Sequence, residues 1–214
     1  MKTKASTKSR QRRTRQTGAA EDSGGLVEAL QIEYARASVN RISEHGDAGE
    51  LAEARAVFEA MREFGDSEEV RLLRATASFN LVLDYGAAGE LAEARAISDA
   101  MQEFGDAEEV QVLRARASFS LILDHAGAGD LAGARAILDA MKEFGDVEKV
   151  RIERAKAAVN LIFFYIDAEK DCASAREIHD GMAGLGDSPE IRVIRNKAAG
   201  ILASHCPERD RREI

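Results

Sequence analysis

Several residue types are scarce in this chain of 214 residues, which has no Trp and only 2 Pro. The composition is nevertheless 45% hydrophobic and 32% charged. A disordered chain would be poorer in apolar residues, so this composition predicts a soluble, helix-rich protein.

Long apolar segments are also missing, and cysteines are few. No apolar run approaches the roughly 18 residues that a membrane span needs, and the N-terminus has no apolar core segment, so we expect no secretory signal. The 2 cysteines, Cys172 and Cys206, are too few for a disulfide framework and fit a reducing compartment. We therefore expect a cytoplasmic location.

Charge is distributed unevenly between the N-terminus and the rest of the chain. Residues 1–20 contain seven Lys or Arg and no acid, whereas the remainder has 23 basic and 38 acidic residues and a net charge of −15. We expect residues 1–24 to form a disordered basic tail, since they cannot bury enough apolar surface to offset their ordering entropy. The tail is solvated, or it binds nucleic acid or anionic lipid, or it serves as a nuclear or organellar address. An acidic body opposes binding to phosphate backbones and favours basic protein partners.

A motif that recurs every 40 residues organises the rest of the chain. It begins at Gly49 as GELAEARAVFEAMREFGD and returns at Gly89 and Gly129, and a divergent copy begins at Cys172. Repetition at this period is typical of solenoids, whose units bury their apolar faces by stacking on their neighbours.

Each repeat predicts two helices. Gly65 fits a helix C-cap, and Asp66 with Glu69 resembles a capping box, so one helix stops and the next starts at the Gly-Asp pair. The helix near 67–85 is apolar on most sides and is predicted to be the inner, buried one, whereas the helix near 89–104 has a single apolar stripe and is predicted to be the outer one. We count nine helices, near 26–45, 49–64, 67–85, 89–104, 107–125, 129–144, 147–166, 171–184 and 188–205. They predict an all-α fold, a right-handed α-solenoid of stacked antiparallel helix pairs, over 25–206, followed by a charged tail at 207–214.

The repeats resemble those of the tetratricopeptide and pentatricopeptide superfamily. Leu81, Tyr85, Gly89 and Ala94 fall where the tetratricopeptide pattern has Leu, Tyr, Gly and Ala. The repeat here is longer than the family's 34 residues or so. Similarity to the pentatricopeptide repeat implies RNA reading, with its first base-reading position at Asn40, Asn80, Ser120 and Asn160. The second position of that code does not match, because the Gly-Asp aspartates lie far before the next Asn.

A narrow polar sector on the inner helices is the candidate binding strip. Stacking predicts that it runs along the concave surface, where an extended peptide could bind. The alternative is that these residues are only solvated, or that the Asn side chains cap neighbouring backbone groups. The strip consists of Arg36, Asn40 and Glu44, then Thr76, Asn80 and Asp84, then Arg116, Ser120 and Asp124, then Lys156 and Asn160, with Phe164 at the last acidic position.

Two other recurrences have structural interpretations. The ladder formed by Arg74, Arg114, Arg154 and Arg195 favours partly buried ion pairs between repeats, with a grip on partner carboxylates as the alternative. The series His45, Tyr85, His125 and Tyr165 predicts packing at the ends of the inner helices.

The sequence indicates a non-enzymatic scaffold or adaptor that binds a protein or peptide of unknown identity. No nucleophile elbow, phosphate loop or HExxH motif is present, so we expect no catalytic residue, no cofactor and no metal. The alternative is RNA or other nucleic-acid binding through residues 1–20, with or without the repeats. Self-association through the exposed terminal helix is a third hypothesis.

Overall fold

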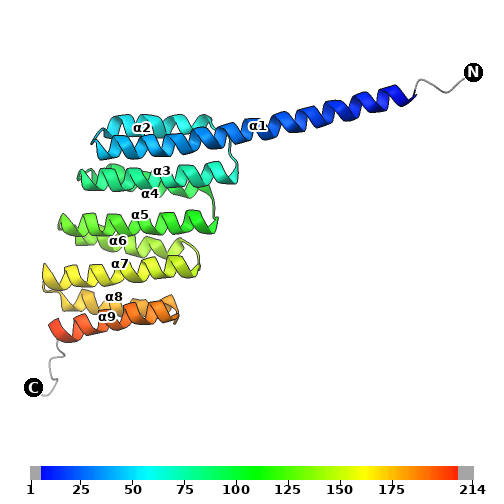
Figure 1. Ribbon diagram of the computed structural model, residues 1–214. Coiled ribbons are helices and arrows are strands. Elements are labelled where there is room, and N and C mark those ends of the chain that lie inside the picture. Colours follow the sequence, from blue (N-terminus) through cyan, green and yellow to red (C-terminus); the bar gives the residue numbers. More distant parts are fainter. Residues whose placement is uncertain (1–5, 207–214) are drawn as a thin grey trace, which may run out of the picture.

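The computed structural model describes residues 6–206, with side chains from residue 24 onward, and in this range the chain is all-α. Nine α-helices follow one another without a strand between them, which confirms the predicted α-solenoid (Figure 1). The helices are α1 Ser6–Asp47, α2 Leu51–Ala60, α3 Glu68–Ala87, α4 Leu91–Ala100, α5 Glu108–Gly127, α6 Leu131–Ala140, α7 Glu148–Asp167, α8 Cys172–Gly181 and α9 Pro189–His205. The expected tail at 207–214 lies outside the described residues.

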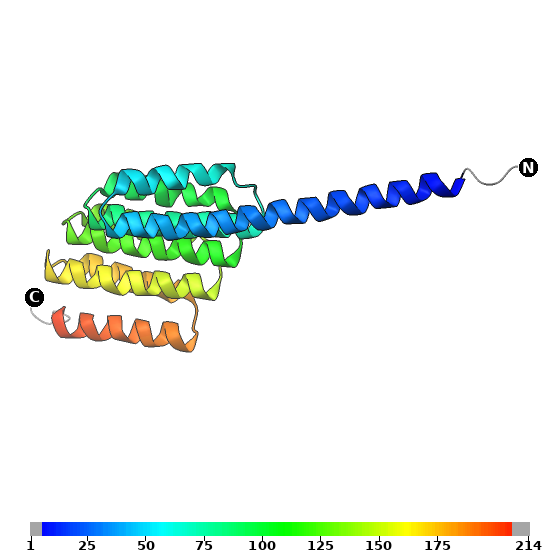
Figure 2. The same ribbon diagram turned by 45° about the horizontal axis from the view of Figure 1, so that its top comes forward.

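The helices form two layers (Figures 1 and 2). We call α1, α3, α5, α7 and the unpaired α9 the A helices, and α2, α4, α6 and α8 the B helices. Each A helix contacts the next A helix and its own B helix, whereas successive B helices contact one another much less. The A layer is therefore the more closely packed side of the stack.

The turn from each B helix to the next A helix is built in the same way every time. The B helix ends in a short 3-10 segment, Met61–Glu63 in the first repeat, and a glycine with positive φ follows, for example Gly105 at φ 92°. This conformation costs an L-residue with a β-carbon energy, so the predicted role of these glycines is confirmed.

The expected position of the N-cap, Asp66, is wrong by one residue, because the cap lies one residue later in the sequence. The N-cap of α3 is Ser67, whose hydroxyl accepts a hydrogen bond from the Val70 backbone N–H, and Ser188 caps α9 in the same way. At the corresponding positions α5 and α7 have Ala107 and Val147, which cannot cap with a side chain. The aspartate instead lies in the turn, where it is available to the arginine ladder.

The core follows the repeat. The small residue that recurs in each B helix is fully buried in all four copies, at Ala54, Ala94, Ala134 and Ala175. Met101 and Phe104, at the end of the predicted stripe of the outer helix, are 0% and 5% exposed. The stripe on the B helices therefore packs against the A layer, as the sequence predicts.

α1 begins at Ser6 and so differs from the expectation of a disordered tail over residues 1–24. Its N-terminal part projects away from the stack (Figures 1 and 2). Ala35 is the first fully buried residue after the exposed stretch that begins at Gly24. The segment has no proline, and a helix already nucleated by packed residues extends at little further cost.

The two cysteines form a disulfide, which the sequence analysis did not foresee. Cys172 is the first residue of α8 and Cys206 is the C-cap of α9, and a bond joins their sulfur atoms. Their separation of 34 residues in the sequence gives no local sign of pairing. They come together because stacking brings the start of a B helix beside the end of the following A helix.

Candidate partner-binding surface

The predicted strip lies on the A helices, with one set of residues on each helix in equivalent positions. Arg36, Asn40 and Glu44 on α1 are exposed, whereas Asp84 and Asp124, on α3 and α5, are half-buried. Arg116 is exposed. The remaining members are half-buried as well, and they are Thr76, Asn80, Ser120, Lys156 and Asn160. The strip is therefore more accessible on α1 than in the middle of the stack.

The basic members of the strip form ion pairs with the next A helix. Arg36 pairs with Glu69 on α3, and Lys156 lies 3.9 Å from Glu190 on α9. Arg116 reaches Glu153 on α7, with 3.8 Å between its Nε and Oε1. These groups couple neighbouring repeats, so only part of their charge is available to a partner.

Glu153 is the buried acid of this network. It is 9% exposed and accepts a hydrogen bond from Lys156 Nζ at 3.3 Å. A buried carboxylate is costly unless it is paired. Arg116 and Lys156 therefore both stabilise the fold by pairing with Glu153. The contact between Glu108 and Lys149, at 2.8 Å, links α5 to α7 a second time.

One hydroxyl and one amide of the strip form hydrogen bonds with the backbone of their own helix. The Thr76 hydroxyl donates to the Leu72 carbonyl oxygen at 2.9 Å, and Asn160 Nδ2 donates to the Lys156 carbonyl oxygen at 2.9 Å. Asn40 is exposed at the equivalent of the Asn160 position. The alternative that these side chains serve the local backbone therefore holds for Thr76 and Asn160.

The acidic members in the middle of the stack lie against glycines of the preceding A helix. A β-carbon at Gly46 would come within 2.0 Å of Asp84 Oδ2, and one at Gly86 within 2.2 Å of Asp124 Oδ2. Both oxygens are buried without a hydrogen-bond donor. Burial raises the pKa of Asp84, with a smaller contribution from the charge of Asp47, and burial also raises the pKa of Asp124.

Sequence reasoning missed an apolar component of the same face. Leu83, Phe163 and Val193, on α3, α7 and α9, are 37%, 50% and 68% exposed. The sequence analysis took the inner helices as buried on nearly all sides. Leu83 lies three residues after Asn80, which places both on one side of the helix. This spacing could have revealed that the face has an apolar component.

The arginine ladder binds the turns rather than the next repeat. Arg74 donates from Nε and Nη2 to the Met61 carbonyl oxygen, at 3.0 and 2.8 Å, and its Nη1 lies 3.7 Å from Asp66. Arg195 likewise donates to the carbonyl oxygen of Gly186, at 2.7 Å, and to Asp187. The predicted pairing with acids is therefore confirmed for these two, but within the turn that precedes their own helix.

The central members of the ladder have different surroundings. The Arg114 guanidinium lies 4.6 Å from the centre of the Phe144 ring, in the next turn along the stack. Burial lowers the pKa of Arg114 and of Arg154. A grip on a partner's carboxylate gains no support from side chains that are engaged or half-buried in this way.

The alternating His and Tyr residues pack at the ends of the A helices, as predicted. The Tyr85 hydroxyl donates to the Leu51 carbonyl oxygen at 3.4 Å, and Tyr165 does the same to Leu131. His125 instead pairs with Asp130 at 2.8 Å, between Nδ1 and Oδ2. No group of three or more His, Cys, Asp or Glu residues that could hold a metal ion occurs among the described residues.

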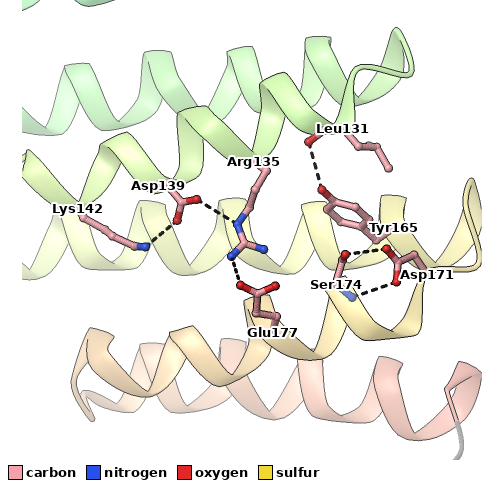
Figure 3. A network of polar contacts seen from close by, with 8 residues as sticks. All are labelled: Leu131, Arg135, Asp139, Lys142, Tyr165, Asp171, Ser174 and Glu177. Carbon is pink, nitrogen blue, oxygen red and sulfur yellow. Dashed lines mark hydrogen bonds and ion pairs between the residues drawn. The ribbon is translucent and has the colours of Figure 1, made fainter.

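A polar network also joins the B helices near the end of the stack, and Figure 3 shows it. Arg135 on α6 pairs with Asp139 of its own helix at 3.2 Å and with Glu177 on α8 at 3.1 Å. On α4, Arg95 pairs with Asp99 four residues later in the same way, at 3.0 Å. The side chain of Glu177 is 72% exposed, so its pair with Arg135 is largely solvated and contributes little to stability.

No protein-family model, curated protein or solved structure matches this chain. The resemblance to tetratricopeptide and pentatricopeptide repeats therefore rests on the residues and on the successive packed helix pairs. No helix in the described part of the chain is long and apolar enough to cross a membrane.

Proposed function

We propose that this chain is a non-enzymatic scaffold that binds an extended segment of another protein along its A helices. The observation that carries the proposal is the mixed chemistry of this face. Exposed apolar side chains, such as Leu83 and Phe163, alternate with amide and charged groups in equivalent positions on successive helices. Such a surface offers apolar contact area and polar groups that fix direction, which is what recognition of an extended peptide requires.

The packing of the helices also favours the A layer as the binding side of the stack. The A helices contact one another more closely than the B helices do, so we infer that the A layer is the inner, concave side. Helical solenoids use their concave surfaces for binding. We further propose that the repeat is of the tetratricopeptide type. The disulfide removes the support that the cysteines gave to a cytoplasmic location.

The experiment compares protein capture from an extract of the native host by three forms of the full chain. The first is the wild type, the second carries Asn80→Ala and Leu83→Ala on the A face, and the third carries Glu53→Ala and Glu93→Ala, which are exposed positions on α2 and α4. Circular dichroism establishes that all three are equally helical. We expect the A-face variant to lose partners that the other two forms retain, measured by quantitative mass spectrometry. Equal capture by all three would contradict the proposal.

Nucleic-acid binding is the second candidate, and one observation favours it. Residues 1–20 contain seven basic residues and no acid, and α1 carries most of this segment away from the acidic stack (Figure 1). A gel shift with single-stranded RNA at two salt concentrations, with and without residues 1–20, tests it. Binding that needs residues 1–20 and weakens with salt would support this candidate, and the absence of a shift at low salt would eliminate it.

A further inference from the structure

The disulfide occupies a contact position that recurs along the stack. Tyr85 reaches the carbonyl oxygen of Leu51, the first residue of α2, and Tyr165 reaches that of Leu131, the first residue of α6. Cys206 and Cys172 hold the same relation, since Cys172 is the first residue of α8. All three pairs are 34 residues apart. A covalent bond therefore replaces, at the last junction, the Tyr-to-carbonyl contact of earlier junctions.

The helix that this bond fastens has less packing support than the A helices in the middle of the stack. α9 is the last described helix, and no B helix follows it before residue 206. Only Ile191, Ala198 and Leu202 of α9 are buried, compared with ten residues of α7, which has the same role one repeat earlier. A helix with few buried apolar contacts opens at low free-energy cost, so a covalent link at its end has a large effect.

The two ends of α9 are held in different ways. At the N-terminal end, the Ser188 cap and the hydrogen bond from Arg195 to Gly186 fix the helix to its own turn. At the C-terminal end, the disulfide and a hydrogen bond from Arg176 to the Cys206 carbonyl oxygen tie it to α8. Among the described residues, breaking the disulfide leaves two polar links to α8 at the C-terminal end. They are the Arg176 hydrogen bond and a weak contact at 3.9 Å between Cys172 Sγ and the His205 carbonyl oxygen.

The bond is within reach of a thiol. Cys206 is 4% exposed, but Cys172 is half-buried and lines an open hollow of about 360 Å³ between α7 and α9. Phe163, Ile166, Ile201 and His205 also line this hollow. A reductant can therefore approach the sulfur of Cys172 through the hollow while the helices remain packed.

We propose that the Cys172–Cys206 disulfide is a redox-sensitive clamp that fixes the C-terminal half of α9 to the stack. A dithiol opens it by thiol–disulfide exchange. The dithiol's two sulfur atoms form a new S–S bond, the Cys172–Cys206 bond breaks, and two electrons and two protons pass to the protein, which then carries two thiols. The freed half of α9 separates from α7 and α8, and the hollow between α7 and α9 opens.

Hydrogen exchange measured by mass spectrometry on the full chain tests the clamp, with dithiothreitol as the dithiol. We expect the amides of residues 198–205, in the C-terminal half of α9, to exchange about ten-fold faster or more after reduction, because the link no longer restricts opening. The amides of α3, which has no cysteine, serve as the internal control and should not change. Equal exchange of residues 198–205 before and after reduction would overturn the proposal, and so would two free thiols in the untreated protein.

Two double variants separate the clamp from a general effect of the reductant. Cys172→Ser with Cys206→Ser should exchange rapidly in α9 with or without dithiothreitol. Cys172→Leu with Cys206→Tyr restores the residue types found at the first and third junctions, and it should exchange slowly under both conditions. Slow exchange in the serine variant, or rapid exchange in the Leu/Tyr variant, would contradict the proposed role of the bond.

Discussion

Asp84 on α3 lies against Gly46 on α1 so closely that a β-carbon at the glycine would come within 2.0 Å of its Oδ2 atom. The next junction repeats the relation with Asp124 and Gly86. At the following junction the corresponding positions hold Phe164 and Ala126. Two of the three junctions thus place an aspartate against a glycine, whereas the third has larger residues at both positions.

Gly46→Ala should therefore stabilise the protein less than an unhindered Gly→Ala change in a helix does. The change itself is worth about 0.5–1 kcal/mol, but the added methyl group has to displace the Asp84 carboxylate, the end of a flexible side chain, which offsets part of the gain. Gly127→Ala is the matched control, because Gly127 is also helical and a methyl group added there would meet nothing within 4 Å. We expect the control to be the more stabilising of the two. Urea denaturation measures both, and equal effects would show that the Asp84 contact is unimportant.

Asp84→Asn should stabilise the protein at neutral pH, and Asp124→Asn should do the same. Burial raises the pKa of both carboxyl groups in the fold, so the folded state holds the proton more tightly than the unfolded state does. The wild type loses stability as the pH rises from about 4, the ordinary Asp value, through the raised pKa. The amide does not titrate, so its advantage should vanish at low pH.

Thermal melts between pH 3.5 and 7.5, each compared with the wild type, test this pH dependence. Glu63→Gln, at an exposed position in the first turn between repeats, is the control for loss of a negative charge at the surface. A lower melting temperature for Asp84→Asn at pH 7, or a gain that does not change with pH, would contradict the prediction.

Arg74→Met should destabilise the protein by about 1–3 kcal/mol, because it removes the charged donor of the hydrogen bonds to the Met61 and Gly65 carbonyl oxygens and leaves Met61 with only the Phe64 backbone N–H. Arg71→Met is the comparison. Arg71 lies 3.8 Å from Asp66 in the same turn, but its side chain is 40% exposed, against 12% for Arg74. A partly exposed ion pair contributes at most about 1 kcal/mol. Denaturation of both variants in urea decides whether carbonyl binding or charge pairing matters in this turn.

Glu177→Ala should change the free energy of unfolding by no more than about 0.5 kcal/mol, despite the pair with Arg135 shown in Figure 3. The first three repeats have Ala56, Ala96 and Ala136 at this position, so the B helices pack without the acid. Melts at low and high salt measure the difference. A loss of several kcal/mol would mean that this pair is much better shielded from water than its exposure indicates.

The period of the sequence was enough to predict the helices, their order and most of their boundaries. Gly-Asp pairs give the turns, because a glycine with positive φ leaves few alternatives. The B helices nevertheless start about two residues later than predicted, since Gly49 and Glu50 belong to the turn. Local residue types determine such features, so a single sequence reveals them.

The partners of the site residues could not be predicted in the same way. The pairing of Arg116 with Glu153, and of Cys172 with Cys206, depends on how far one helix is shifted along the next. The period shows which residues are equivalent, but not which ones meet across a junction. The partial exposure of Leu83 depends on the same stacking. These contacts are tertiary, and only the packed structure determines them.

The long first helix has a mechanical consequence. At about 1.5 Å of rise per residue, the stretch from Ser6 to Tyr34, which precedes the first buried residue, measures about 40 Å. A rod of this length acts as a spacer with one end anchored. If the proposed nucleic-acid binding by this segment is correct, its ligand would lie apart from a segment bound to the A helices, so the two would not compete for space.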